Sequence, residues 1–210
     1  MVLPILVAAA FLFSLTALAV RLRPALALRK PDFSRPRGSA AAGVAYAYSI
    51  GMLPWTKQSG REHALAYVRG ALFHVGIFLS FAVLALTLTP WLAGFPAGQR
   101  TGVALFLAVT CLAGLLGLWD RFRQRNLRAL SVPEDYTAIV VVAAFVGLAA
   151  AAVRWPGLTG LFQAWSAWLL LYLPFSKLRH VWFFFFMRYF YGSHFGHRGV
   201  LPHPRMLEAR

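Results

Sequence analysis

The chain has 210 residues, of which 60% are hydrophobic and only 13% are charged. This composition is too apolar for a soluble domain of that size and indicates an integral membrane protein. The net charge of +15 does not indicate nucleic-acid binding, because the basic residues cluster beside apolar segments. We therefore expect the lipid bilayer as a partner and no nucleic acid.

Five apolar runs are each long enough to cross a bilayer, which takes roughly 20 residues. In chain order they cover about residues 2–20, 70–92, 101–119, 136–153 and 158–180, and an aromatic and basic tail follows at 181–210. The sequence therefore predicts an all-α integral membrane protein. We expect a five-transmembrane-helix bundle that forms a single membrane domain over residues 1–210.

The first run has no basic residue before it, whereas Arg21 and Arg23 follow it. This pattern favours a retained membrane span over a cleaved signal peptide. The next segment, 29–37, is rich in proline and basic residues and predicts an exposed loop. Residues 39–53 are rich in small side chains but too short to span, so we expect a helix at the membrane surface.

The segments between the runs alternate in charge, and this alternation predicts the orientation. They carry nine, one, four, one and six Lys or Arg residues in chain order, which puts 19 of the 21 on one side. Cytoplasmic loops are the ones enriched in Lys and Arg. We therefore expect the N-terminus outside and the C-terminus in the cytoplasm.

Two histidines in different runs are the main candidates for chemistry. His74 lies in the second run, about five residues (roughly 7 Å) inside the expected cytoplasmic edge at Arg69. His180 follows the fifth run at a similar expected depth. An ionisable ring inside a membrane span is costly and usually functional. Two neutral imidazoles from facing helices can hold one haem iron from both sides.

Three basic residues near these histidines are candidate partners for the haem propionates: Arg69, Lys177 and Arg179. A histidine near an interface can also simply hydrogen-bond to backbone or water. That reading stays open, more so for His180 than for His74, because apolar residues flank His74 directly.

Several other residues have weaker signals. Cys111 is a lone cysteine in an apolar run, where we expect it to pack. His63 could hydrogen-bond a quinone carbonyl or a propionate, although a solvated residue at a helix start is the plainer interpretation. Pro133, followed by two acidic residues, predicts a helix start.

The tail offers two further features. It contains His194, His197 and His203, for which we favour partner docking in a loop over metal binding. The aromatic stretch 182–191 predicts either an interfacial belt or a contact with a cytoplasmic subunit, presented by a fifth helix that continues past the bilayer.

The sequence contains no set of residues typical of a substrate-level catalytic centre. Six acidic residues occur in all, and none lies in the middle of a run. This disfavours a proton or ion carrier, and likewise a transporter or a lipid-modifying enzyme, because intramembrane ionisable groups mark such pathways.

The two histidine motifs also carry a family resemblance. The segment Pro174-Phe175-Ser176-Lys177-Leu178-Arg179-His180 resembles the fifth-helix signature of the respiratory nitrate reductase gamma subunit family. Leu72-Phe73-His74-Val75-Gly76-Ile77 resembles its second-helix signature, and Glu134-Asp135-Tyr136 is also similar. Related cytochrome b membrane anchors serve heterodisulfide-reductase-like and sulfite-reduction-associated complexes.

The resemblance implies that His74 and His180 bind a b-type haem near the cytoplasmic side. The family carries a second histidine pair for an outer haem, but this chain has Leu84 and Phe162 at the matching positions. Neither side chain can bind iron, so we expect one haem b. The departure also leaves the quinone or quinol site open, since the family places it beside the outer haem.

Together these expectations describe a haem b membrane anchor of a respiratory oxidoreductase in a prokaryotic cytoplasmic (inner) membrane. It would pass electrons between the quinone pool, or another membrane donor, and a cytoplasmic iron–sulfur subunit. Additional membrane subunits are a further possible source of electrons. The alternative is a haem-free membrane scaffold that tethers or assembles a respiratory complex.

Overall fold

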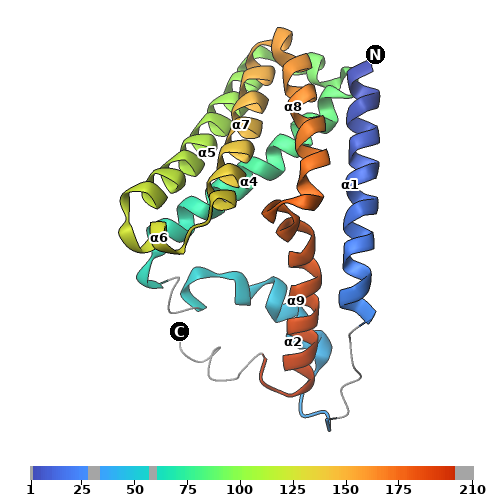
Figure 1. The fold of residues 1–210 in the computed structure, drawn as a ribbon, viewed down its shortest axis with the longest axis vertical. Coiled ribbons are helices and arrows are strands. Elements are labelled where there is room, and N and C mark those ends of the chain that lie inside the picture. The colour runs from blue at the N-terminus through green and yellow to red at the C-terminus, as the bar shows by residue number, and fades with distance from the viewer. Residues whose placement is uncertain (1, 28–33, 57–60, 202–210) are drawn as a thin grey trace. The chain divides into compact units, whose positions relative to one another are not determined.

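The computed structural model of the chain describes residues 2–27, 34–56 and 61–201 (Figure 1). These residues form helices joined by short connections, and none of them lies in a β-strand. This part of the chain contains five helical segments long and apolar enough to cross a membrane. The all-α class and the five apolar helices are thus confirmed. The chain divides into two compact units, which we describe in turn.

The first unit comprises the residues up to Ala17 together with Val68–Leu178. It contains most of α1 (Val2–Ala27) and α4 (Ala64–Thr87), and all of α5 (Ala97–Arg123), α6 (Arg125–Leu130), α7 (Pro133–Arg154) and α8 (Thr159–Tyr172). The 3-10 turns Pro90–Gly94, Pro156–Leu158 and Leu173–Phe175 lie between or after these helices.

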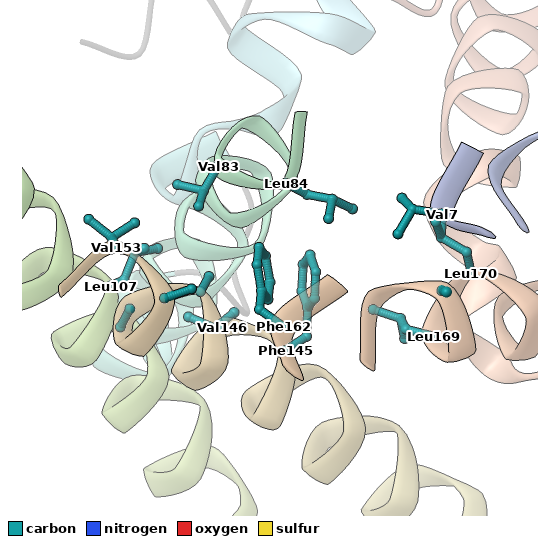
Figure 2. Packing of buried hydrophobic residues seen from close by; sticks show 14 of the residues in the cluster. Val7, Val83, Leu84, Leu107, Phe145, Val146, Val153, Phe162, Leu169 and Leu170 are labelled. Carbon is teal, nitrogen blue, oxygen red and sulfur yellow. The ribbon is translucent and has the colours of Figure 1, made fainter. Parts of the chain in front are cut away.

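Helix α7 is the most buried of the five apolar helices. Half of its most apolar 18-residue window is buried, against 22% in each of α1, α4 and α5. Its Phe145 is fully buried and stacks on Phe162 of α8 with ring centroids 5.5 Å apart (Figure 2). The Phe145 ring also contacts Phe81 of α4. The core of the first unit therefore forms around α7.

The remaining faces of these helices are apolar but exposed. Val2, Leu12, Leu105 and Leu161 are each more than half exposed. Such a large apolar surface would be unfavourable in water, whereas the acyl chains of a bilayer solvate apolar side chains. The exposed apolar faces are consistent with contact with lipid.

The helix ends differ from the predicted spans by a few residues. Helix α4 begins six residues before the predicted start and ends at Thr87, not at residue 92. Its early end is explained by Pro90, because a proline disfavours the helical conformation in the residue before it. Helix α7 begins at Pro133 as predicted, and the Asp135 carboxylate accepts the backbone N–H of Val132 at 2.9 Å.

The fifth predicted span, 158–180, is not one continuous α-helix. Helix α8 ends at Tyr172, and the 3-10 turns Leu173–Phe175 and Lys177–Arg179 follow, separated by an extended Ser176. Pro174 has no N–H to donate, so the α-helical ladder cannot continue through it. The expectation of a fifth helix that continues through the aromatic stretch is therefore wrong.

The second unit comprises Leu18–Tyr67 and the chain from Arg179 onward. Its two main helices are α2 (Ala40–Tyr48) and α9 (His180–His197), which pack side by side (Figure 1). The Ser39 hydroxyl accepts the N–H of Ala42 and caps α2, which confirms a helix in the segment 39–53. The 3-10 turns Ile50–Met52 and Pro54–Thr56 follow α2.

Glycines allow α2 and α9 to approach closely. A Cβ added at Gly192 would lie 2.6 Å from the Val44 Cα, and one added at Gly196 would lie 2.8 Å from the Gly43 Cα. Small residues four apart let helix backbones touch in this way. The glycines of the tail, which suggested a loop, thus form a helix contact.

Helix α9 ends in a glycine-based cap. Gly199 has φ +71°, and the N–H of Val200 donates to the Phe195 carbonyl at 2.9 Å. This is the Schellman arrangement, in which a left-handed residue closes the helix. Because α9 extends to His197, the loop predicted around His194 and His197 is wrong. His203 and the rest of 202–210 lie outside the described residues.

Candidate functional site

His74 lies on α4 with its side chain exposed. Its Nδ1 is 2.7 Å from the carbonyl oxygen of Gly70, one helical turn earlier. A carbonyl can only accept, so Nδ1 is the donor in this contact, and in a neutral ring the lone pair is then on Nε2. Histidine ligands typically donate their second ring N–H to a carbonyl or carboxylate, which fixes the tautomer and the ring. Nε2 is therefore the ring atom of His74 that could act as a ligand.

Arg69, the first candidate propionate partner, lies about 1.4 helical turns before His74 on α4. Its Nη1 lies 2.5 Å from Oδ2 of Asp120 on α5, and both side chains are about one-quarter exposed. The ion pair ties the two helices together at the predicted cytoplasmic edge. Arg69 thus has a structural partner that sequence reasoning missed, since the two residues are 51 positions apart.

The motif around Ser176 forms a compact turn held by the start of α7. The backbone N–H of Lys177 donates to Glu134 at 2.6 Å, and the Lys177 ammonium lies 2.8 Å from Asp135. The Ser176 hydroxyl, which is buried, accepts the N–H of Leu178 at 3.2 Å. Glu134 and Asp135 therefore lie at the start of α7 and also bind the segment around Lys177.

Lys177, the second candidate propionate partner, is therefore in an ion pair, although its side chain remains 44% exposed. Arg179 precedes α9 and is exposed. His180 is the first residue of α9 and is also exposed. His74 and Lys177 belong to the first unit, whereas Arg179 and His180 belong to the second.

His63, the candidate quinone partner, lies in the second unit directly before α4 and is exposed. Its backbone carbonyl accepts the N–H of Tyr67 at 3.0 Å. This is the geometry of a residue in a first helical turn, where the following N–H groups seek acceptors. The observed contact involves the His63 backbone, so a quinone role for its ring stays a prediction.

The two positions that the resemblance matches to a second histidine pair are packed in the core. Leu84 is 5% exposed and Phe162 is fully buried, and both belong to the apolar cluster around Phe145 (Figure 2). Cavities larger than a water molecule are rare in such close-packed cores. Neither Leu84 nor Phe162 has an atom that can ligate iron, and both side chains contribute to the core by apolar burial.

The described part of the chain holds no group of three or more His, Cys, Asp or Glu side chains arranged for a metal ion. In the tail, the Nε2 of His197 lies 2.9 Å from the Ser34 carbonyl, and its own carbonyl accepts the N–H groups of Arg37 and Gly38. His197 thus joins the start of the α2 segment to the end of α9. This contact gives it a structural role within the second unit.

The aromatic stretch lies on α9. Phe185, Met187 and Tyr189 are 49%, 65% and 46% exposed, and the Tyr48 hydroxyl donates to the carbonyl of Phe185. Exposed aromatic and methionine side chains are typical both of protein contacts and of membrane interfaces. Both predicted roles of the stretch remain open.

Comparison with known proteins gives no assignment: no family model matches the chain, and no curated protein or solved structure matches it significantly. The resemblance to nitrate reductase gamma subunits therefore rests on the two histidine motifs and on the Glu134-Asp135-Tyr136 segment alone.

Proposed function

We propose that this chain is the haem b-containing membrane anchor of a respiratory oxidoreductase complex. The observation that carries the proposal is the state of His74. Its Nδ1–H is bonded to the Gly70 carbonyl, which leaves Nε2 as the atom able to coordinate iron. His180, in the second motif, would supply the other axial ligand. The haem would act as a one-electron relay, with no substrate-level catalysis by this chain.

The basic residues would hold the propionates. Arg179 is an exposed guanidinium next to His180 in sequence and suits bidentate pairing with a carboxylate. Arg69 and Lys177 are already paired with Asp120 and Asp135, so either would have to share its donors with a propionate. Of the three candidates, Arg179 is the one we weight most.

One haem b is proposed, not two, because Leu84 and Phe162 stand at the second pair of positions and pack in the apolar core. A quinone or quinol would exchange electrons with this single haem, with His63 as a candidate hydrogen-bond partner. The tail, including its aromatic helix, would contact a cytoplasmic iron–sulfur subunit.

The orientation and location belong to the same proposal. Nineteen of the 21 basic residues would face the cytoplasm, with the N-terminus outside and the C-terminus inside a prokaryotic inner membrane. The five apolar helices are consistent with a multi-pass protein.

The test is a reduced-minus-oxidised spectrum of the purified chain in detergent, with haem quantified per polypeptide. We expect about one low-spin b haem per chain, since two imidazoles saturate one iron. His74→Ala and His180→Ala should each abolish the low-spin spectrum, whereas His194→Ala, a matched control in the tail, should retain it. A spectrum that survives both motif substitutions, or a second haem, would contradict the proposal.

The second candidate is a haem-free scaffold. It is favoured by one observation: Arg69 and Lys177 both find acidic partners within the protein, as cations with a purely structural role do. A chain that folds, that is monodisperse in detergent and that contains no haem when produced with excess haem precursor would support the scaffold.

A further inference from the structure

A groove lies between α5 and α7 within the first unit. It has a volume of about 480 Å³, in the range of small-molecule sites. Its lining includes Ala108 and Cys111 on α5 and Gly147 on α7, together with Thr101, Arg154 and Trp155. Thr101 near the start of α5 and Arg154 at the end of α7 give the groove one polar and basic end, and the rest of its lining is apolar.

The apolar part exists because the facing side chains are small. A Cβ added at Gly147 would lie 3.5 Å from the Cys111 Sγ, which is an ordinary van der Waals contact. Ala108, three residues before Cys111, is exposed to the groove side of α5. From Thr101 to Leu115 the groove follows about 21 Å of helix. This exceeds half of the roughly 30 Å hydrocarbon core, so one extended acyl chain fits its length.

The polar end has a single sign of charge. Arg154 is exposed in the last turn of α7, its guanidinium lies 5.7 Å from the Trp155 ring, and both residues line the groove beside Thr101. Among the described residues that line the groove, Arg154 carries the one full charge. Arginine suits planar pairing with phosphate, and tryptophan prefers the membrane interface.

From this arrangement we propose that the α5–α7 groove binds an anionic glycerophospholipid. Its phosphate would pair with Arg154 and Thr101, and one acyl chain would lie along Ala108 and Gly147. A guanidinium beside an interfacial tryptophan can pair with the phosphate of an anionic head group. The site is independent of the histidine motifs and goes beyond the proposed electron transfer.

Cys111 makes the site measurable, because it is the chain's one cysteine and lines the groove. Its thiol donates to the Ala143 carbonyl at 3.3 Å, so a bound acyl chain would cover it without displacing a partner. An apolar maleimide should label Cys111 more slowly when phosphatidylglycerol is bound. At three times the dissociation constant, we expect about a fourfold slower rate, since about one quarter of the sites are then empty.

The experiment titrates the full chain in neutral detergent with phosphatidylglycerol or phosphatidylcholine of matched acyl chains. Native mass spectrometry counts bound lipid, and maleimide labelling follows Cys111. We expect one phosphatidylglycerol to be retained with a preference over phosphatidylcholine. Arg154→Gln should weaken phosphatidylglycerol binding about tenfold and remove the protection at low lipid. Arg125→Gln, a matched exposed arginine on α6, should change neither readout.

A second variant fills the groove. Ala108→Leu should abolish lipid retention in the mass spectra, whereas Ala9→Leu, an exposed alanine on α1, should leave it intact. Equal binding of both lipids by the unmodified chain would overturn the proposal, as would full retention in Ala108→Leu. Protection of Cys111 that depends on protein concentration and not on lipid would assign the groove to a second copy of the chain, which also overturns it.

Discussion

Substituting Gly192 with alanine tests the closest helix contact of the second unit. The added Cβ would lie 2.6 Å from the Val44 Cα and 2.7 Å from the Gly43 carbonyl oxygen, and both are backbone atoms that cannot rotate away. Overpacking of this kind costs about 1–3 kcal/mol. Alanine also gains up to about 1 kcal/mol over glycine in a helix, which offsets part of the loss. We expect a net destabilisation.

Gly102→Ala is the matched control, because nothing lies within 4 Å of a Cβ added there on α5. This variant should gain the helix propensity alone and stabilise the chain by about 0.5–1 kcal/mol. Since both substitutions gain the same propensity, the difference between them isolates the overpacking term. That difference should therefore be about 1–3 kcal/mol.

The assay is amide hydrogen exchange in detergent, followed by mass spectrometry of peptides from α2 and α5. At tenfold per 1.4 kcal/mol, a net loss of about 1 kcal/mol in Gly192→Ala would accelerate exchange across residues 40–48 roughly fivefold, and exchange in α5 should stay unchanged. Slower or unaltered exchange of α2 in Gly192→Ala, alongside the expected behaviour of Gly102→Ala, would refute the close approach of α2 and α9.

Two further predictions concern the first unit. Arg69→Gln should lower the free energy of unfolding in mixed micelles by about 1–2 kcal/mol, because it leaves the partly buried Asp120 without its partner. Adding Asp120→Asn should recover much of this loss. Equal losses in the single and double variants would contradict a coupled pair. In a Cys111→Ala background, an impermeant maleimide added to intact cells should label Gln99→Cys and spare Gln124→Cys. The charge pattern predicts that the start of α5 lies outside and its end lies in the cytoplasm. The reverse labelling would contradict the predicted orientation.

The spans were predictable because composition and length suffice to define them. A helix must satisfy its own backbone in a bilayer, so an apolar run of about 20 residues has few alternatives. The helix ends were less predictable. Helix α1 continues through Arg21 and Arg23 to Ala27, since long basic side chains can extend from a helix end to the polar interface.

The glycines of the tail show why local patterns fail. Gly192 and Gly196 resembled loop residues because glycine disfavours an isolated helix. Their role depends on Gly43, about 150 positions earlier in the chain, whose backbone occupies the space a Cβ would need. No local periodicity reports such a partner, whereas Gly199, with its positive φ, does act as the helix stop that its residue type predicts.

The candidate site was predicted by residue type, but the partners of its charged residues were not. Lys177 was assigned to a haem propionate, yet it contacts Glu134 through its backbone and Asp135 through its side chain. In the sequence the two acids predict a helix start and form part of the resemblance, but neither feature places them beside Lys177. A contact across 42 positions requires the fold, and it shows that one motif of the resemblance, Glu134-Asp135, holds another in place.

The packing of the core also bears on the proposed number of haems. At the positions of the second histidine pair, Leu84 and Phe162 pack in one apolar cluster, where Phe162 stacks on Phe145 at 5.5 Å (Figure 2). A buried imidazole needs hydrogen-bond partners, and a haem needs a cavity, whereas aromatic and aliphatic side chains need neither and contribute by burial alone. Placing histidines at both positions would therefore not by itself create a site, because the Phe145 ring packs against Phe81 of α4 and Phe162 of α8. The chain can hold a haem only where its core is not already closed, and this requirement is the physical reason to propose one and not two.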